Sequence, residues 1–172
     1  DVRGVLMKNW SEEDFGGPCP WEEDQASAKA VAKHLKIPLE IWNFEKEYRD
    51  LVFKAMIHEY EQGRTPNPDI LCNREIKFAL FLHHALKSVP LIATGHYARI
   101  TNGHLYKAID ADKDQSYFLA AVSSKALKKT LFPLGDLKKT QVRNIAKNAG
   151  LPNWDRPDST GICFIGEKKM RT

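Results

Sequence analysis

The feature that most constrains the fold is the order of apolar and amphipathic segments in the first third of the chain. A short apolar run from Val2 to Met7 precedes an amphipathic segment from Glu22 to Leu35, and Leu39 to Phe44 precedes a second one from Tyr48 to Tyr60. The long segments have the period of an α-helix, whereas the short ones fit strands. Parallel strands need a crossover connection, usually a helix, so this order predicts an α/β fold with a parallel sheet.

The same order repeats once. A helix is predicted from Ile76 to Leu86 and a strand from Leu91 to Thr94, directly before Gly95. In open parallel sheets, ligands bind beyond the carboxyl ends of the strands. We therefore expect Met7 to Trp10 and Gly95 to Tyr97 to line one pocket.

After Gly95 the alternation of strands and helices stops. Asn102-Gly103 is a dipeptide typical of a type I′ hairpin turn, so Tyr97 to Thr101 and His104 to Ile109 are predicted to be antiparallel strands. Helical segments are then expected from Gln115 to Val122, from a cap at Ser123 or Ser124 to Leu131, and from Thr140 to Ala149. The hairpin and these helices extend the α/β core.

Composition excludes several classes of protein. The 172 residues are 42% hydrophobic and 28% charged, which is close to an average globular domain and unlike a disordered or collagen-like chain. No run approaches the ~20 apolar residues that a membrane-spanning helix needs. The 26 basic and 22 acidic residues leave a net charge of +4, which permits a polyanionic partner without requiring one.

Three cysteines are present, and their spacing fits neither a disulfide framework nor a zinc site. We interpret Cys19, in a loop with Pro and Gly, as structural or incidental. Cys163 lies between Ile162 and Phe164, and apolar surroundings favour an inert thiol when this residue is taken alone. In the functional alternative, its Gly-containing loop moves and carries a sulfur atom to Cys72.

Cys72 itself follows a loop with two prolines. Asp69 is expected to cap the helix that begins there, which would place Cys72 in the first turn. The positive end of the helix dipole favours a thiolate and hence a nucleophile. A buried cysteine that acts as a small apolar residue is the commoner case, and the polar neighbours Asn73 and Arg74 leave both interpretations open.

Two further segments are candidates for contacts with a nucleotide or a nucleic acid. Gly95 lacks a side chain, so a nucleotide can approach its backbone. His96 can supply a hydrogen bond or a charge, although a buried histidine with satisfied hydrogen bonds is more common. Lys113-Asp114-Gln115-Ser116 can present side chains to a phosphate or a base, and equally fits a solvated turn that caps a helix.

Six motifs occur in order along nearly the whole chain: Gly4 to Trp10, Gly63 to Asn73, Ala93 to Arg99, Lys113 to Ser116, Phe132 to Gly135 and Asp158 to Gly166. Together they closely resemble the tRNA-specific 2-thiouridylase family. The two motifs that contain Cys72 and Cys163 are long and unusual, so chance agreement is implausible.

The resemblance implies an adenine nucleotide α-hydrolase-like (Rossmann-like) fold. Residues 1–109 would be part of the catalytic domain with its hairpin, and residues 110–172 a helical extension with the loop of the persulfide cysteine. The implied activity is a tRNA-uridine 2-sulfurtransferase that uses ATP, with Mg²⁺ bound through the ATP phosphates and no protein ligand identified for the metal. The expected partners are tRNA and a persulfide sulfur donor protein, with no membrane, in the cytoplasm or the mitochondrial matrix.

The motif positions also imply residue roles. Cys72 would be the nucleophile, Cys163 the persulfide carrier and Asp69 the acid/base, and a Cys72–Cys163 disulfide would close after sulfur delivery. Met7 and Gly95 would contact the nucleotide. The target base or the rest of the tRNA would contact Asn67, Pro68, Asp69, His96, Lys113, Asp114 and Gln115.

One departure from the family pattern is large. The phosphate loop, Ser-Gly-Gly-x-Asp-Ser, would lie before Asp1, and the family's later domains would lie beyond Thr172. We therefore expect a fragment with little activity of its own. The alternatives are a non-catalytic tRNA-binding remnant and an ATP-dependent synthetase of the same group, which would not need two distant cysteines.

Overall fold

The computed structural model describes residues 1–10 and 21–157. The chain divides into two compact units, one made of Asp1–Arg49 with the chain from Arg143 onward, and the other of Asp50–Val142. Within the two described ranges, no helix has both the length and the apolar character needed to cross a membrane.

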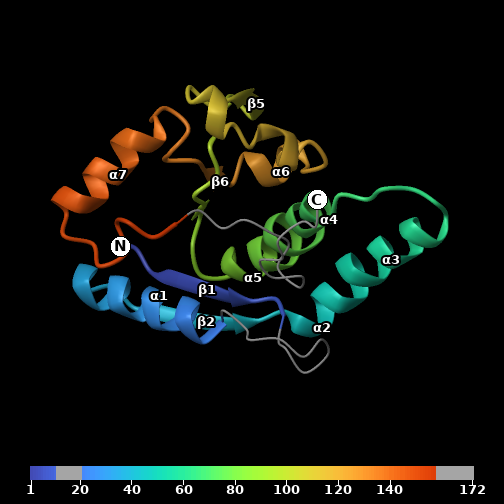
Figure 1. The fold of residues 1–172 in the computed structure, drawn as a ribbon, viewed down its shortest axis with the longest axis horizontal. Coiled ribbons are helices and arrows are strands. Elements are labelled where there is room, and N and C mark those ends of the chain that lie inside the picture. Colours follow the sequence, from blue (N-terminus) through green and yellow to red (C-terminus); the bar gives the residue numbers. More distant parts are fainter. Residues whose placement is uncertain (11–20, 158–172) are drawn as a thin grey trace, which may run out of the picture. The chain divides into compact units, whose positions relative to one another are not determined.

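The first unit is built on a parallel pair of strands. β1 (Gly4–Lys8) and β2 (Leu39–Asn43) pair along their whole length. They are joined by α1 (Trp21–Leu35), which packs along both strands (Figure 1) and carries three acidic residues in its first turn. The predicted strand–helix–strand order is therefore confirmed for this unit.

The two ends of α1 are tied to the last part of the chain. α7 (Lys139–Asn148) is followed by Ala149, whose carbonyl lies 2.8 Å from Nε2 of His34 at the end of α1. At the other end of α1, the guanidinium of Arg156 forms an ion pair with Asp24. These contacts stabilise the unit although its two chain segments are far apart in sequence.

Next along the chain, a continuous helical stretch is formed by α2 (Glu45–Tyr48), the π-helical η2 (Arg49–Phe53) and α3 (Lys54–Glu61). Tyr48, Val52 and Met56 are spaced four residues apart and are almost fully buried, as an amphipathic helix requires. The stretch ends at Gly63, whose φ of 71° is the left-handed conformation common after a helix.

Another continuous helical stretch follows within the second unit. It consists of α4 (Pro68–Leu71), the π-helical η3 (Cys72–Phe81) and α5 (Leu82–Ala85). Ile76 and Phe78 are buried within it. The predicted helical segment from Ile76 to Leu86 is confirmed, and the helical stretch begins at Pro68, just before the start expected after an Asp69 cap.

The second unit contains one strand that the sequence pattern did not predict, β6 (Thr130–Leu131). It runs parallel to β3 (Ile92–Ala93), which lies within the strand predicted from Leu91 to Thr94. The helix expected to reach Leu131 ends at Leu127, as α6 (Ser124–Leu127), with Ser123 as its cap. The prediction was wrong here because pairing with β3 outweighs the local helical pattern, and two residues are too few to show a strand period.

The predicted hairpin is confirmed. β4 (Ala98–Thr101) and β5 (His104–Lys107) are antiparallel, and both turn residues, Asn102 and Gly103, have positive φ values of 53° and 79°. Two 3₁₀ turns follow, η4 (Ala111–Lys113) and η5 (Ser116–Leu119). The second is shorter than the helix predicted from Gln115 to Val122.

The α/β class is thus confirmed. The strands of the described residues form three pairs, β1 with β2, β3 with β6 and β4 with β5. Met7 lies in the first unit and Gly95 in the second, so their expected meeting in one pocket stays a prediction. The domain boundary at residue 109 also stays a prediction.

Candidate active site

The start of α4 is shaped by an asparagine and a proline. Asn67 is extended, with φ −111° and ψ 98°, as expected before Pro68, which occupies the first turn of the helix. The Asn67 Oδ1 accepts hydrogen bonds from the N–H groups of Asp69 at 3.1 Å and Ile70 at 3.4 Å. The prediction that Asp69 caps the helix is therefore wrong, because Asn67 reaches the unpaired N–H groups instead.

The carboxyl group of Asp69 is consequently not used by the cap. Burial raises its pKa, and the positive charge of Lys77 opposes that rise without cancelling it. Among the described residues, no hydrogen bond to this carboxyl stabilises its ionised form. A carboxyl group with a raised pKa keeps its proton closer to neutral pH, as an acid/base residue must.

Cys72 is the residue that follows α4. It is the fifth residue of the helical stretch, beyond the first turn in which the dipole acts strongly, so the expected first-turn position is wrong. Its exposed fraction is 4%. The thiol is thus three residues from Asp69 and shielded from water, and it can react only after its surroundings open.

His96 lies directly after Gly95 at the end of β3. Its Nδ1 is 2.8 Å from the hydroxyl of Thr94, and its ring packs against Phe78 and Phe132, with centroids 5.7 and 5.9 Å away. Burial, aided by the charge of Lys77, lowers the pKa of His96 to about 3. The ring is therefore neutral near pH 7, which favours a hydrogen-bonding or stacking role over the charged one considered from the sequence.

Among the described residues, none packs so closely against Gly95 that a side chain there would be excluded. Of these residues, a Cβ atom at Gly95 would meet Leu134 alone, at an ordinary contact distance of 3.8 Å. The backbone at this strand end therefore leaves room beside it. This room agrees with the close approach of a ligand that the sequence predicts.

The segment from Lys113 to Gln115 is held largely by internal contacts. The Gln115 side-chain oxygen accepts a hydrogen bond from the Tyr97 N–H at 3.0 Å, and the main-chain N–H of Gln115 donates to the Tyr97 carbonyl at 2.8 Å. The Asp114 carboxylate accepts hydrogen bonds from the Ala108 N–H and the Ser116 hydroxyl, both at 2.8 Å. These bonds give Asp114 and Gln115 a structural role that does not require tRNA, whereas the side chain of Lys113 is exposed.

Asp114 also differs from Asp69 electrostatically. Burial tends to raise the pKa of Asp114, but the hydrogen bonds from Ala108 and Ser116 and the nearby charge of Lys107 outweigh it and lower the pKa. This carboxylate therefore stays ionised and holds the loop before η5. It is not suited to proton transfer.

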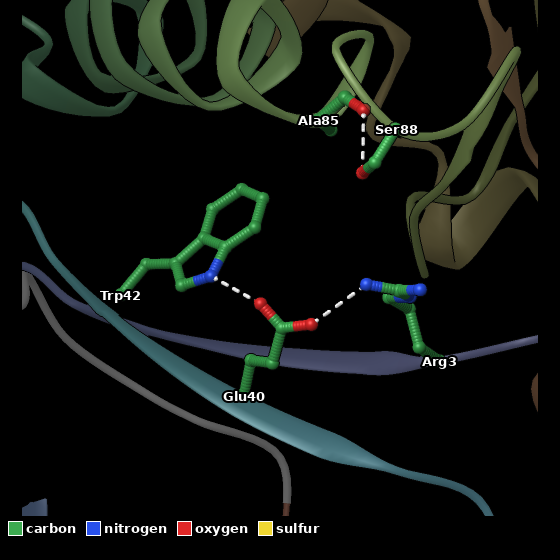
Figure 2. A network of polar contacts seen from close by, with 5 residues as sticks. All are labelled: Arg3, Glu40, Trp42, Ala85 and Ser88. Carbon is green, nitrogen blue, oxygen red and sulfur yellow. Dashed lines mark hydrogen bonds and ion pairs between the residues drawn. The ribbon is translucent and has the colours of Figure 1, made fainter.

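Met7 lies on β1 in the first unit, opposite Trp42 in the strand register. Figure 2 shows how the strand pair is held beside it: Glu40 accepts hydrogen bonds from Arg3 and from the indole of Trp42, both at 2.9 Å. Met7 is half-buried at the carboxyl end of its strand, the end at which ligands bind in such sheets.

The structure brings one group of the predicted residues together. Asn67, Pro68, Asp69 and Cys72 share one helix start, and the charge of Lys77 acts on both Asp69 and His96. Cys163 and Cys19 lie outside the described residues, so the predicted approach of Cys163 to Cys72 stays a prediction.

Three residues with a bearing on this site were missed from the sequence: Asn73, Lys77 and Thr94. Asn73 and Lys77 follow Asp69 by four and eight residues, which is one helix face, and this spacing was the signal that could have found them. Thr94 contacts His96 through the fold of a strand end. In the described part of the chain, no group of three or more His, Cys, Asp or Glu residues is placed to hold a metal ion.

Comparison with known proteins gives a consistent result. Residues 1–167 match the family model of the tRNA methyl transferase HUP domain. The chain is 54% identical to the tRNA-specific 2-thiouridylase MnmA of Legionella pneumophila (strain Paris) over 99% of its own length and 49% of the relative's. It is 52% identical to the MnmA of Levilactobacillus brevis and 51% identical to that of Herminiimonas arsenicoxydans, over 98% and 99% of its length and 46% and 49% of theirs.

The chain therefore spans about half the length of these curated relatives. They belong to the class of protein that the six sequence motifs predicted. The predicted resemblance is confirmed.

Proposed function

From the premise that the chain belongs to the tRNA methyl transferase HUP domain family, we propose that it is the catalytic portion of a tRNA-uridine 2-sulfurtransferase. Its substrate would be the wobble uridine of tRNA, which becomes 2-thiouridine. The names of the relatives support this substrate and reaction. A non-catalytic tRNA-binding remnant is the alternative, and the burial of Cys72 is the observation that favours it.

The observation that carries the proposal is the pairing of Asp69 and Cys72 at one helix start. Asp69 holds a proton more firmly than an ordinary aspartate, and the sulfur-bearing residue follows it by three positions. Sulfur transfer to a carbonyl carbon needs a group that moves protons and a soft nucleophile. Asp69 fits the first need, and Cys72 is the thiol that can react with the persulfide that carries the sulfur; both lie on a helical segment capped by Asn67.

The nucleotide is assigned to the ends of β1 and β3. Two separate observations support this assignment: Met7 lies near the carboxyl end of β1, and the backbone at Gly95, just after β3, is unhindered. Strand ends of this kind are where nucleotides bind in such sheets. ATP, when bound, supplies the group that turns the C2 oxygen of uridine into a leaving group. Mg²⁺ would be held by the ATP phosphates.

In the proposed reaction, a sulfur donor protein loads a persulfide onto Cys163, and its outer sulfur attacks C2 of the uridine and displaces the oxygen that ATP has activated. The Cys72 thiolate then attacks the inner sulfur, that of Cys163; the S–S bond breaks, 2-thiouridine is released and a Cys72–Cys163 disulfide forms. An external thiol reductant restores both thiols. The target base must leave the anticodon stack to reach Asp69 and the residues beside it. Neutral His96 and exposed Lys113 would contact the tRNA, with Asp114 and Gln115 shaping the loop.

The cellular setting follows from the relatives. Those named above are bacterial, which favours the bacterial cytoplasm over the mitochondrial matrix. The chain spans half of their length, and we expect it to be far less active alone than the longer gene product. Comparable thiolation by the isolated 172-residue chain would contradict this expectation.

The test uses the longer gene product with tRNA transcript, ATP, Mg²⁺ and a persulfide donor, and measures 2-thiouridine by mass spectrometry of digested tRNA. Cys72→Ser and Cys163→Ser should each abolish the product, whereas the matched control Cys19→Ser should retain it. Product formation by both former variants would overturn the two-cysteine mechanism and revive the synthetase alternative. tRNA binding by the parent protein with no 2-thiouridine would establish the non-catalytic remnant.

A further inference from the structure

Asn73 is a polar residue in an apolar place. Its exposed fraction is 2%, and among the described residues only Thr130 is a comparably buried polar residue. The hydroxyl of Thr130 donates a hydrogen bond at 3.0 Å to the carbonyl of Ala126, four residues earlier, so its donor is used. Asn73 makes the equivalent bond, from Nδ2 to the carbonyl of Asp69 at 2.9 Å, but its Oδ1 is buried with no hydrogen-bond partner among the described residues.

Asp69 is therefore held on both sides of its main chain. The Asn67 Oδ1 accepts from its N–H, and the Asn73 Nδ2 donates to its carbonyl. The orientation of the Asn73 amide follows from this second bond, because only the nitrogen can donate to a carbonyl oxygen. One asparagine lies two residues before Asp69 and the other four residues after it.

The buried Oδ1 of Asn73, which has no hydrogen-bond partner among the described residues, argues against a merely structural role. A buried acceptor without a partner costs stability, and an apolar residue of similar volume would avoid this cost. Buried polar groups that remain unsatisfied need an explanation other than packing. The explanation offered by the geometry is the bond to Asp69.

We propose that Asn73 is a positioning residue, whose carboxamide acts with that of Asn67 to clamp the peptide of Asp69 and fix where its carboxyl group lies relative to Cys72. This inference rests on the proposed role of Asp69 as the acid/base. It assigns to Asn73 no contact with substrate.

The carboxyl group of Asp69 reports on the clamp. Burial raises its pKa, and the charge that acts against the rise is that of Lys77 on η3. The other element packed against α4 is η5, whose one ionisable side chain, Tyr117, is more than half exposed. If the clamp is lost, the Asp69 carboxyl can turn towards water, and its pKa should fall to the ordinary range of an aspartate.

The decisive pair of variants is Asn73→Thr and Asn73→Val. The two side chains have nearly the same shape, but only Thr has a hydroxyl that can donate to the carbonyl four residues earlier, as Thr130 does in this chain. The Asp69 carboxyl is titrated by ¹³C NMR in the 172-residue chain. We expect a raised pKa in the parent and in Asn73→Thr, and a lower pKa in Asn73→Val; equal pKa values in the two variants would overturn the proposal.

Activity in the longer gene product gives a second readout. Asn73→Val should lower kcat for 2-thiouridine formation about tenfold to a hundredfold, with little change in KM for tRNA, because misplacement of a reacting group affects the chemical step. Asn73→Thr should restore most of kcat. A rise in KM alone would contradict a positioning role. If the longer protein forms no 2-thiouridine, the proposed function fails, while the NMR titration still decides on the clamp.

A measurement on the unaltered chain covers the case in which Asn73→Val does not fold. Hydrogen exchange of the side-chain amide protons should be slow for Asn73 and fast for the exposed Asn148, which serves as the internal control. Equally fast exchange at both residues would show that the Asn73 amide is not held, and would overturn the proposal.

Discussion

The start of α4 and the loop before η5 each contain an aspartate from a predicted site motif, and the two environments shift the pKa of the aspartate in opposite directions. Asp69 is half-buried beside Cys72, and its pKa is raised because no hydrogen bond from the described residues compensates for burial. Asp114 is also drawn in from solvent, but it accepts hydrogen bonds from Ala108 and Ser116, and its pKa is lowered. Uncompensated burial suits proton transfer, whereas compensated burial suits structure.

The largest effect should come from Asp69→Asn. This change keeps the shape of the side chain and removes its titratable proton, so 2-thiouridine formation by the longer gene product should fall by a factor on the order of 10² to 10⁴. The folded chain should lose no stability at pH 7, because a carboxylate that is costly to bury is replaced by a neutral group. Urea unfolding at pH 7 and the nucleoside assay measure the two effects. Near-parental activity would contradict the claim that Asp69 transfers protons.

The acid sensitivity of the second unit should depend on His96. Its pKa is lowered in the fold from the ordinary 6.5 to about 3, so the unfolded chain binds the proton first, and stability is lost as the pH falls below about 6.5. His96→Phe keeps an aromatic ring between Phe78 and Phe132 and removes this proton, so the variant should lose less stability than the parent between pH 7 and pH 5. His104→Gln, at an exposed histidine, is the control and should leave the loss unchanged.

Asp114→Asn should have the converse effect to Asp69→Asn. The amide keeps one acceptor for the two donors, so the free energy of unfolding should fall by about 1 kcal/mol at pH 7. This loss should shrink as the pH falls through the folded pKa of Asp114, because a lowered carboxyl pKa stabilises only above that range. Activity per folded molecule should stay within a few-fold of the parent. A hundredfold loss of activity without a loss of stability would make Asp114 a reacting residue.

The smallest effect should come from Lys113→Gln. Lys113 is exposed in the same loop, and if it contacts one tRNA phosphate, its loss should weaken binding modestly at low salt. The slope of log affinity against log salt should become shallower by about 0.7 to 0.9, the value for one phosphate contact. Lys125→Gln, at another exposed lysine, is the matched control. An unchanged slope for Lys113→Gln would remove this residue from the tRNA contacts.

Much of the architecture could be predicted from the sequence because it depends on local patterns. The strand–helix–strand order and the Asn102-Gly103 turn follow from periodicity and from backbone conformations that few residues adopt. β6 (Thr130–Leu131) could not be predicted, because a strand of two residues exists only through its pairing with β3. Such pairing depends on residues almost forty positions away in the chain.

The chemistry of the site could be predicted only in part. The sequence indicated which motif holds Asp69 and Cys72, but Asn67 rather than Asp69 caps the helix, and both residue types are good caps, so their identity alone did not decide between them. The burial of Cys72 and the low pKa of His96 depend on neighbours from other elements. Asn73 was given no role although its spacing of four residues from Asp69 allows a side-chain bond to the Asp69 carbonyl, because many residues at this spacing make no such bond.

The most direct test of the account is a ¹³C NMR titration in which the carboxyl carbons of Asp69 and Asp114 are followed in one sample of the chain. We expect Asp69 to titrate above the ordinary range of an aspartate and Asp114 below it. Titration of both carboxyls together, or of Asp69 below Asp114, would contradict the claim that Asp69 is the residue held ready for proton transfer.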